Sequence, residues 1–230
     1  MKRLWLLIVC LGLMLAACDV EQTTDIYLQD ILDVQDSGET IYNNAVLAIE
    51  FSGDEEDKEE IGDLLKQYLN DVSDIREEER NYSTYLLVNY KLPIALADNT
   101  ESAYRLPEVR GNIFTFVVIG DTLNIAFNND RFKELDAALY KEYYRHLEFE
   151  DFTMRVFLHN DLRDPVSITL YSVYVNNMPV PYSATFTAER RDELEVIFSD
   201  VLRDSAVTPG ETETSGITLR QFAEFELATK

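Results

Sequence analysis

The chain has 230 residues, of which 43 are Asp or Glu and 20 are Lys or Arg, so its formal net charge at pH 7 is −23. This acidity excludes nucleic acid as an expected partner, because binding it requires a basic surface that neutralises phosphates. Apolar residues make up 46% of the chain, which is enough to fill one large or two small domains.

Residues 1–17 have the pattern of a secretion signal. Two positive charges, Lys2 and Arg3, precede an apolar run from Leu4 to Ala17. The run is too short for a membrane-spanning helix and has the flanking residues of a signal peptide. We therefore expect a signal peptide over residues 1–17.

The run ends in Leu15-Ala16-Ala17-Cys18, which resembles the lipobox of bacterial lipoproteins. In that family, signal peptidase II cuts just before a cysteine whose sulfur carries diacylglyceryl and whose amine is usually acylated, for example with palmitate. The resemblance implies that Cys18 is lipidated and begins the mature protein. Two or three acyl chains, at about 0.8 kcal/mol per buried methylene, would make membrane dissociation negligible. The alternative is an ordinary signal peptide, cut after Ala17, that leaves a free thiol.

Asp19 follows the expected lipidation site and, in enterobacterial lipoproteins, resembles a signal for retention in the inner membrane. Val20 is neither acidic nor an amide, so sorting to the outer membrane stays open. We expect a lipid-anchored protein on the periplasmic side of the cell membrane, with the inner membrane favoured. Residues 18–24 are polar after the cysteine and are expected to form a short lipidated tether.

The cysteine positions and the net charge further restrict the chemistry expected of the mature chain. Cys10 lies in the signal and Cys18 is used by the anchor, so we expect neither a disulfide nor a catalytic cysteine. Without residues 1–17 the chain keeps 18 basic and 43 acidic residues, a net charge of −25. No Lys or Arg lies between Cys18 and Lys58 to bind anionic headgroups, so acyl chains alone should hold the protein at the membrane.

Residues 25–148 are expected to form an α+β module in which two helices pack on an N-terminal sheet. Residues 23–34 fit both a strand and a helix, whereas 39–51 are typical of a strand. The clearer helix runs from Glu55 to Val72, with Ser52 or Asp54 as its N-cap. One apolar stripe supports it, formed by Ile61, Leu64, Leu65, Tyr68, Leu69 and Val72.

The second half of this module contains a strand, a hairpin and a helix. Residues 81–96 alternate like a strand, which Pro93 should interrupt at an edge or a bulge. Residues 112–130 have the strongest hairpin pattern, with Gly120-Asp121 suited to a type II′ turn. A helix from Asp130 to His146 should bury a stripe of Phe132, Leu135, Leu139 and Tyr143. The tyrosines at 140, 143 and 144 could stack on a ligand, but packing of the helix on a sheet is the simpler interpretation.

From residue 149 onward alternation dominates, and we expect a mostly β, sandwich-like module over 149–230. Asn176-Asn177 should make a turn, and two prolines make the segment after it an edge or irregular strand. Residues 190–203 fit both a helix and a strand, and the surrounding pattern favours a strand. The other expected strands are 152–158, 166–175 and 217–228, with a polar loop over 208–216.

Few residues carry a motif with known chemistry. The catalytic and nucleotide-binding motifs G-x-S-x-G, S-x-x-K, the P-loop and the Rossmann glycines do not occur. His146 and His159 share no zinc motif; we interpret the first as a helix-dipole partner and the second as solvent-facing. The oxygen-rich segments 128–130 and 160–164 and the acidic run at 55–60 favour turns, caps and a helix start over calcium sites. We expect no cofactor, no metal and no catalytic residue.

The sequence thus indicates a noncatalytic, lipid-anchored envelope protein that binds a membrane or periplasmic protein near the membrane. With its lipobox and its acidic, disulfide-free body, the chain resembles small lipoproteins of bacterial chromosomes and prophages. The alternative is a solute-binding or hydrolytic envelope lipoprotein that uses a carboxylate-lined pocket.

Overall fold

The computed structural model describes residues 20–51, 55–80, 82–143, 146–147, 152–207 and 216–226. Its strands are β1 (Val20–Tyr27), β2 (Ile41–Phe51), β3 (Asn70–Arg80), β4 (Ser83–Leu96), β5 (Phe114–Ile119), β6 (Thr122–Asn128), β7 (Phe152–His159), β8 (Val166–Val175), β9 (Met178–Ala188), β10 (Glu193–Phe198) and β11 (Ile217–Glu226). Its helices are α2 (Leu28–Ser37), α3 (Glu55–Leu65), α4 (Thr100–Ala103), α5 (Pro107–Gly111), α6 (Asn129–Tyr143) and α7 (Asp200–Val207).

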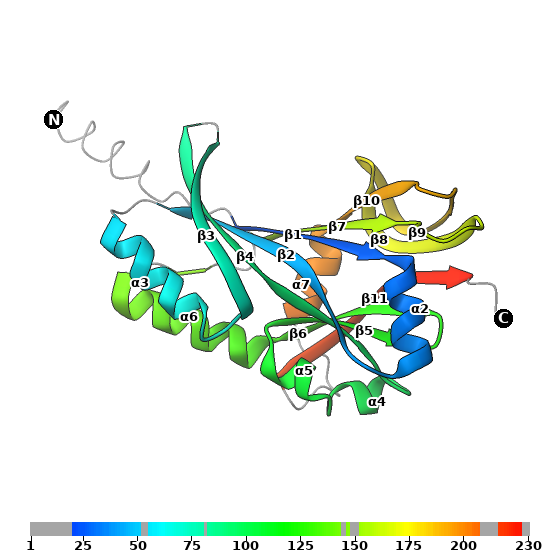
Figure 1. The fold of residues 1–230 in the computed structure, drawn as a ribbon, viewed down its shortest axis with the longest axis horizontal. Coiled ribbons are helices and arrows are strands. Elements are labelled where there is room, and N and C mark those ends of the chain that lie inside the picture. The colour runs from blue at the N-terminus through cyan, green and yellow to red at the C-terminus, as the bar shows by residue number, and fades with distance from the viewer. Residues whose placement is uncertain are drawn as a thin grey trace, which may run out of the picture.

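Nine strands close into a barrel (Figure 1). Their order is β10-β7-β1-β2-β4-β5-β6-β11-β8, and β8 pairs back with β10 to complete the ring. The other two strands lie outside the ring, β3 on β4 and β9 on β8. The expected α+β fold with a sandwich-like second half is therefore wrong, because the protein is mostly β and its sheet is closed.

The two expected modules are two arcs of this one closed sheet. The strands before residue 149 form the arc β1-β2-β4-β5-β6, and those after it form the arc β11-β8-β10-β7. The arcs join where β1 pairs in parallel with β7 and where β6 pairs antiparallel with β11. Hydrophobic periodicity reports which face of a strand is buried but not which strand lies beside it. Closure leaves the nine ring strands without an unpaired sheet edge, which is the usual liability of open sheets.

Most of the expected tether belongs to the barrel. Val20 to Thr24 form the first part of β1, and alternate residues Val20, Gln22 and Thr24 are buried. Residues 21–24 are polar, so the sequence pattern did not indicate a strand. Two of the inward positions of this strand are polar, namely Gln22 and Thr24. Cys18 and Asp19 lie outside the described residues.

The helix predicted from Glu55 to Val72 is real but shorter, because α3 ends at Leu65. The chain then makes a tight turn and enters β3, which the sequence did not predict. β3 lacks an apolar alternation because it lies outside the ring and is largely exposed. Helix and strand approach closely at Gly62, where a Cβ would lie 2.7 Å from the Cδ1 of Ile75. The N-cap predicted at Ser52 or Asp54 lies outside the described residues.

Pro93 does not interrupt β4, which runs unbroken to Leu96. On one side β4 pairs with β2 along its length, and Pro93 faces Tyr42. On the other side β4 pairs with β3 as far as Lys91 and with β5 from Ile94. Pro93 therefore lies where β4 changes partner, a position at which a missing N–H interrupts no described pairing.

The hairpin and the second helix are confirmed, although α6 covers Asn129–Tyr143 and His146, its expected last residue, is not helical. β5 and β6 pair antiparallel around Gly120, whose φ is +56°, as the first central residue of a type II′ turn requires. α6 buries Phe132, Leu135 and Leu139 as expected. The side chain of Tyr143 lies outside the described residues.

The contested segment at 190–203 contains both structures. β10 covers 193–198, as favoured, and α7 begins at Asp200. Asn176 and Asn177 form the expected turn with φ of 48° and 64°. β9 is an edge strand, as its two prolines predicted, and continues to Ala188. The loop predicted at 208–216 lies outside the described residues except for Gly216.

The interior of the barrel is mostly aliphatic and contains a set of packed phenylalanines. Phe222 packs against Phe116 and Phe198 at ring-centroid distances of 5.8 and 4.9 Å, and Phe114 packs against Phe127 at 5.3 Å. Outside the ring, α3 packs against α6, and α7 contacts β6, β8 and β11. Figure 1 shows α3 and α6 near the start of β1, with α2 at the opposite end of the molecule.

Candidate functional site

The described part of the chain begins at one end of the barrel, two residues after Cys18. Val20, the first residue of β1, is fully buried and pairs with Ile49 of β2 and Phe152 of β7.

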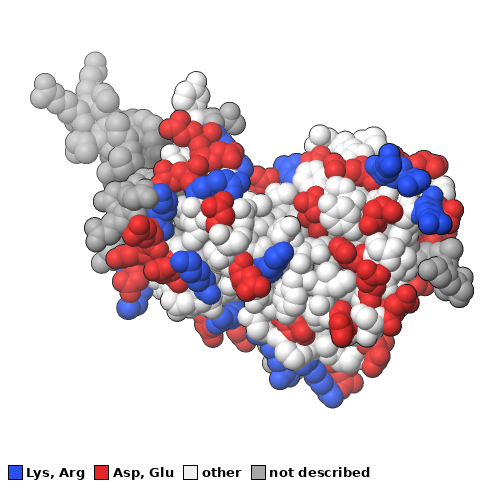
Figure 2. Space-filling model, viewed as in Figure 1, with Lys and Arg blue, Asp and Glu red and all other residues white. Residues whose placement is uncertain are grey.

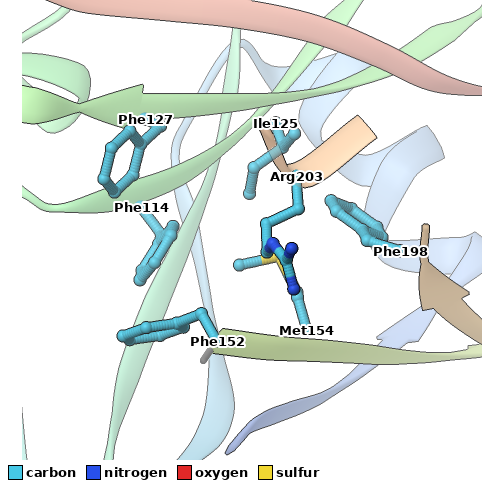
Figure 3. Close-up of a pocket in the computed structure, with 7 residues that line it drawn as sticks. All are labelled: Phe114, Ile125, Phe127, Phe152, Met154, Phe198 and Arg203. Carbon is cyan, nitrogen blue, oxygen red and sulfur yellow. The ribbon is translucent and has the colours of Figure 1, made fainter. Parts of the chain in front are cut away.

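A small cavity lies near the same end, because Phe152, the partner of Val20, lines it (Figure 3). The space between its side chains is about 290 Å³ when open solvent is included, and the cavity itself has room for about one water molecule. Figure 3 shows side chains from β5, β6, β7, β10 and α7 arranged around it. The lining residues are Phe114, Ile125, Phe127, Phe152, Met154, Phe198 and Arg203.

Arg203 is the charged residue in the cavity wall, and nearby carboxylates neutralise its charge. Its guanidinium lies 3.3 Å from a carboxylate oxygen of Asp200 and 3.0 Å from one of Asp204. Arg203 is mostly buried, whereas both aspartates are exposed, so the compensation comes from the solvent side. The cavity wall is therefore apolar and close to neutral.

Two buried polar side chains lie deeper in the barrel. Gln22 is fully buried, and within the described residues neither its amide atoms nor the Tyr90 hydroxyl makes a hydrogen bond of good geometry. Leaving such a group unsatisfied costs about 1–3 kcal/mol. Burial strongly raises the pKa of the Tyr90 hydroxyl, and the neighbouring Gln22 amide offsets part of that rise. Tyr90 therefore stays protonated and can act as a hydrogen-bond donor.

His159 is not solvent-facing as expected. Its Nε2 lies 2.7 Å from Asp25 and its Nδ1 3.5 Å from Glu193, so carboxylates from both neighbouring strands flank it. Its ring stacks on Tyr27 at a centroid distance of 4.7 Å, and 21% of its side chain is exposed. Contacts across adjacent strands, which periodicity cannot show, cover a residue on the outer face. His159 therefore links β7 through its side chain to β1 and to β10.

His146 pairs with a carboxylate. Its Nδ1 lies 3.1 Å from Asp136, and its ring stacks on Tyr140 at 4.1 Å. Tyr140 is thus engaged with this histidine at the surface of α6, whereas we expected it to pack on a sheet. Tyr144 lies outside the described residues.

The oxygen-rich loops act as caps and turns, as predicted. Asn128 accepts a hydrogen bond from the Arg131 backbone N–H at 3.1 Å and so caps α6. Asn160 is buried, donates to the Ala188 carbonyl and accepts from the Leu162 N–H. Asp161 accepts from the backbone N–H of Gln29, which satisfies a donor in the first turn of α2.

Asp161 also affects the pKa of the Asp30 carboxyl, which is raised from its ordinary value. Burial raises the pKa of the Asp30 carboxyl, and the negative charge of Asp161 raises it further, although a hydrogen bond from Asn43 opposes both. A carboxyl whose folded-state pKa is raised opposes folding above that pKa, and the penalty vanishes as the pH falls below the ordinary value of 3.8.

Replacing Asp30 with asparagine is therefore expected to increase the free energy of unfolding at pH 7 slightly. The gain should shrink as the pH is lowered and be absent at pH 3, because the native carboxyl is then also neutral. Urea denaturation of both chains at several pH values measures this. A variant that is less stable than the native chain at pH 7 would contradict the assignment.

Across the described part of the chain, no three or more His, Cys, Asp or Glu side chains are grouped to hold a metal ion. None of the described helices is both long enough and apolar enough to cross a membrane.

Comparison with known proteins identifies one family. A family model described as "Domain of unknown function (DUF7424)" matches residues 20–222. The match begins at the first residue of β1 and ends within β11, so it spans the barrel. No curated protein and no solved structure matches the chain.

Proposed function

We propose that this chain, which belongs to the DUF7424 family, is a noncatalytic, lipid-anchored protein of the bacterial cell envelope that acts by binding another protein near the membrane. One observation carries the proposal. Leu15-Ala16-Ala17-Cys18, which resembles a lipobox, ends just before Val20, where the barrel begins. The body would therefore stand directly on the bilayer, without a long stalk, and would meet partners at a fixed height.

The end of the barrel nearest residue 20 is then the membrane-facing end. The β3–β4 hairpin lies at this end in Figure 1 and carries the fully exposed Tyr82 at its turn. β9, with the exposed Tyr182, lies far from the start of β1. A partner in the membrane would meet the first of these regions, and a periplasmic partner could meet the second.

The charge distribution supports anchoring by acyl chains alone. Figure 2 shows acidic side chains across the visible face, with a dense group over the β3–β4 hairpin and α3. Glu77, Glu78 and Glu79 are exposed there. Anionic headgroups would repel this surface within about 8 Å at physiological salt. Asp19 favours the periplasmic side of the inner membrane as the site of attachment.

The alternative from the sequence, a solute-binding or hydrolytic lipoprotein with a carboxylate-lined pocket, has less support. The residues that line the described cavity at the membrane-facing end include four phenylalanines and no carboxylate. A small apolar cavity of this kind lends no support to a carboxylate-dependent hydrolase or to a solute-binding site.

The proposal is tested by covalent capture of neighbours in intact cells. A photo-crosslinking amino acid is placed at Tyr82 or at Tyr182, in the native chain and in an unlipidated form. In that form an ordinary cleavable signal replaces residues 1–17 and serine replaces Cys18. We expect the native chain to capture one or a few defined envelope proteins that the unlipidated form does not. Identical captured proteins for both forms would show that anchoring is irrelevant and would refute the proposal.

A further inference from the structure

Two strands of the sheet have an unpaired edge. Among the described strands, β3 pairs with β4 alone and β9 pairs with β8 alone, so each leaves one row of backbone N–H and C=O groups without a strand partner. Such a row can accept a strand from another chain, and soluble proteins usually prevent this with charged side chains, prolines or bulges. Figure 1 shows the two edge strands on opposite sides of the molecule.

The two edge strands differ in charge. β3 contains the run Glu77, Glu78 and Glu79, so a second copy of the chain placed along it would bring like charges together. By contrast, no Asp, Glu, Lys or Arg occurs from Pro165 to Ala188, a range that covers the whole β8–β9 hairpin. In a chain with 43 acidic residues, two copies can therefore meet along β9 without placing carboxylates opposite each other.

The part of β9 that can accept a strand is short and is limited at both ends. Pro181 has no N–H, and the register with β8 shifts by one residue beside it, so regular pairing with β8 begins at Ser183. At the other end the strand stops at Ala188, before the charged turn 189–192. Thr185 lies midway between Pro181 and that turn, so it is the natural centre of a symmetric pairing.

This segment is complementary to itself around Thr185. When two identical antiparallel strands are related by a two-fold axis at Thr185, that residue faces its own copy. Ser183 then faces Thr187, and Ala184 faces Phe186. Facing Ser and Thr side chains can hydrogen-bond across a sheet, and a small alanine leaves room for the phenylalanine ring opposite it. The same axis maps the outward row of backbone N–H and C=O groups onto itself, because these groups belong to alternate residues.

The side chains of this segment are accessible. Ser183, Thr185 and Thr187 are exposed, whereas Phe186 is only partly buried against the core. The Thr185 hydroxyl lies 2.9 Å from that of Thr169 on β8, and a hydroxyl can both donate and accept, so it can bind a further partner. A second copy would therefore continue this row of hydroxyls across the interface and cover the remaining exposed part of the phenylalanine ring.

We infer that the edge of β9 is a self-association surface, at which two copies of the chain pair antiparallel through residues 183–187 around Thr185. The occupant is a second copy because the facing side chains match under this axis and no like charges meet there. Pairing joins the sheets of the two copies into one. This surface goes beyond the proposed function and does not rest on it, because all of its residues lie in β9.

The test uses the body of the protein, residues 18–230 with Cys18→Ser, which contains every described element. Sedimentation equilibrium at physiological salt measures its association. Thr185→Lys and Thr185→Glu each place like charges opposite each other at the two-fold axis, whereas an equimolar mixture of the two variants places opposite charges there. Ser73→Lys, at an exposed residue of β3, is the matched control for the added charge.

We expect the native body and Ser73→Lys to form dimers at about 100 μM, with an affinity about tenfold lower for each Thr185 variant alone. The mixture should form heterodimers about tenfold more tightly than either variant pairs with itself, because residue 185 faces its own copy. A native body that stays monomeric at this concentration would overturn the inference and leave the edge to a strand of another protein. Dimers that neither Thr185 variant weakens, or that mixing the two does not restore, would also overturn it.

Discussion

A Cys18→Ser chain is expected to incorporate no labelled palmitate and to keep residues 1–17, whereas the native chain incorporates the label and loses them. The reason is chemical, because a serine hydroxyl cannot take the place of the cysteine thiolate that receives diacylglyceryl. Labelling of cells followed by immunoprecipitation and gel electrophoresis measures both effects. The expected loss of label is complete.

Cys10→Ser is the matched control for this experiment. Cys10 lies within the apolar run of the expected signal, so its replacement should leave labelling and processing unchanged. Labelling of the Cys18→Ser chain at the native level would contradict lipidation at Cys18, as would loss of labelling in the Cys10→Ser chain alone.

Replacing Phe222 with alanine is expected to lower the free energy of unfolding by about 3–5 kcal/mol. Phe222 is fully buried in the barrel and packs against Phe116 and Phe198, so truncation leaves a cavity that rings on other strands cannot easily fill. Folded domains are stable by only about 5–15 kcal/mol, so this is a large fraction of the total. Urea denaturation of the body, residues 18–230, measures it.

The control is Tyr182→Ala on β9, outside the ring. Tyr182 is strongly exposed, and surface substitutions of this kind usually change stability by less than about 0.5 kcal/mol. A loss below 1 kcal/mol for Phe222→Ala, or equal losses for the two variants, would contradict a closed barrel packed around Phe222.

Local structure was largely predictable, whereas the arrangement of the strands was not. The hairpin around Gly120 and the helix ending near Tyr143 follow from turn chemistry and apolar spacing, which act over a few residues. The pairing of Val20 with Phe152 joins segments far apart in the sequence, and both strands would alternate in the same way beside other partners. This is why two modules were expected where one closed sheet exists.

The wrong assignments have one cause: the polarity of a residue does not determine whether it is buried. Gln22 and Thr24 are polar and were assigned to a tether, yet both point into the barrel. Conversely, β3 is rich in Glu and Asp because it lies outside the ring, so it carried no alternation to reveal a strand. The alternation of Val20, Gln22, Thr24 and Ile26 in burial shows that period two was present, with polar residues at two inward positions.

The candidate site was predicted in part. Turn and cap roles for Asn128 and Asn160 followed from their side-chain chemistry and are confirmed. The cavity could not be found in this way, because its phenylalanines come from four different strands. Such a constellation exists only once the barrel is closed.

Whether a lipid on Cys18 holds the acidic barrel directly at the membrane can be measured by mass spectrometry of the mature N-terminal peptide. We expect a peptide that begins at Cys18 and carries diacylglyceryl on its sulfur, with or without a further acyl group on its amine. An unmodified thiol at Cys18, or a mature chain that begins at another residue, would contradict it.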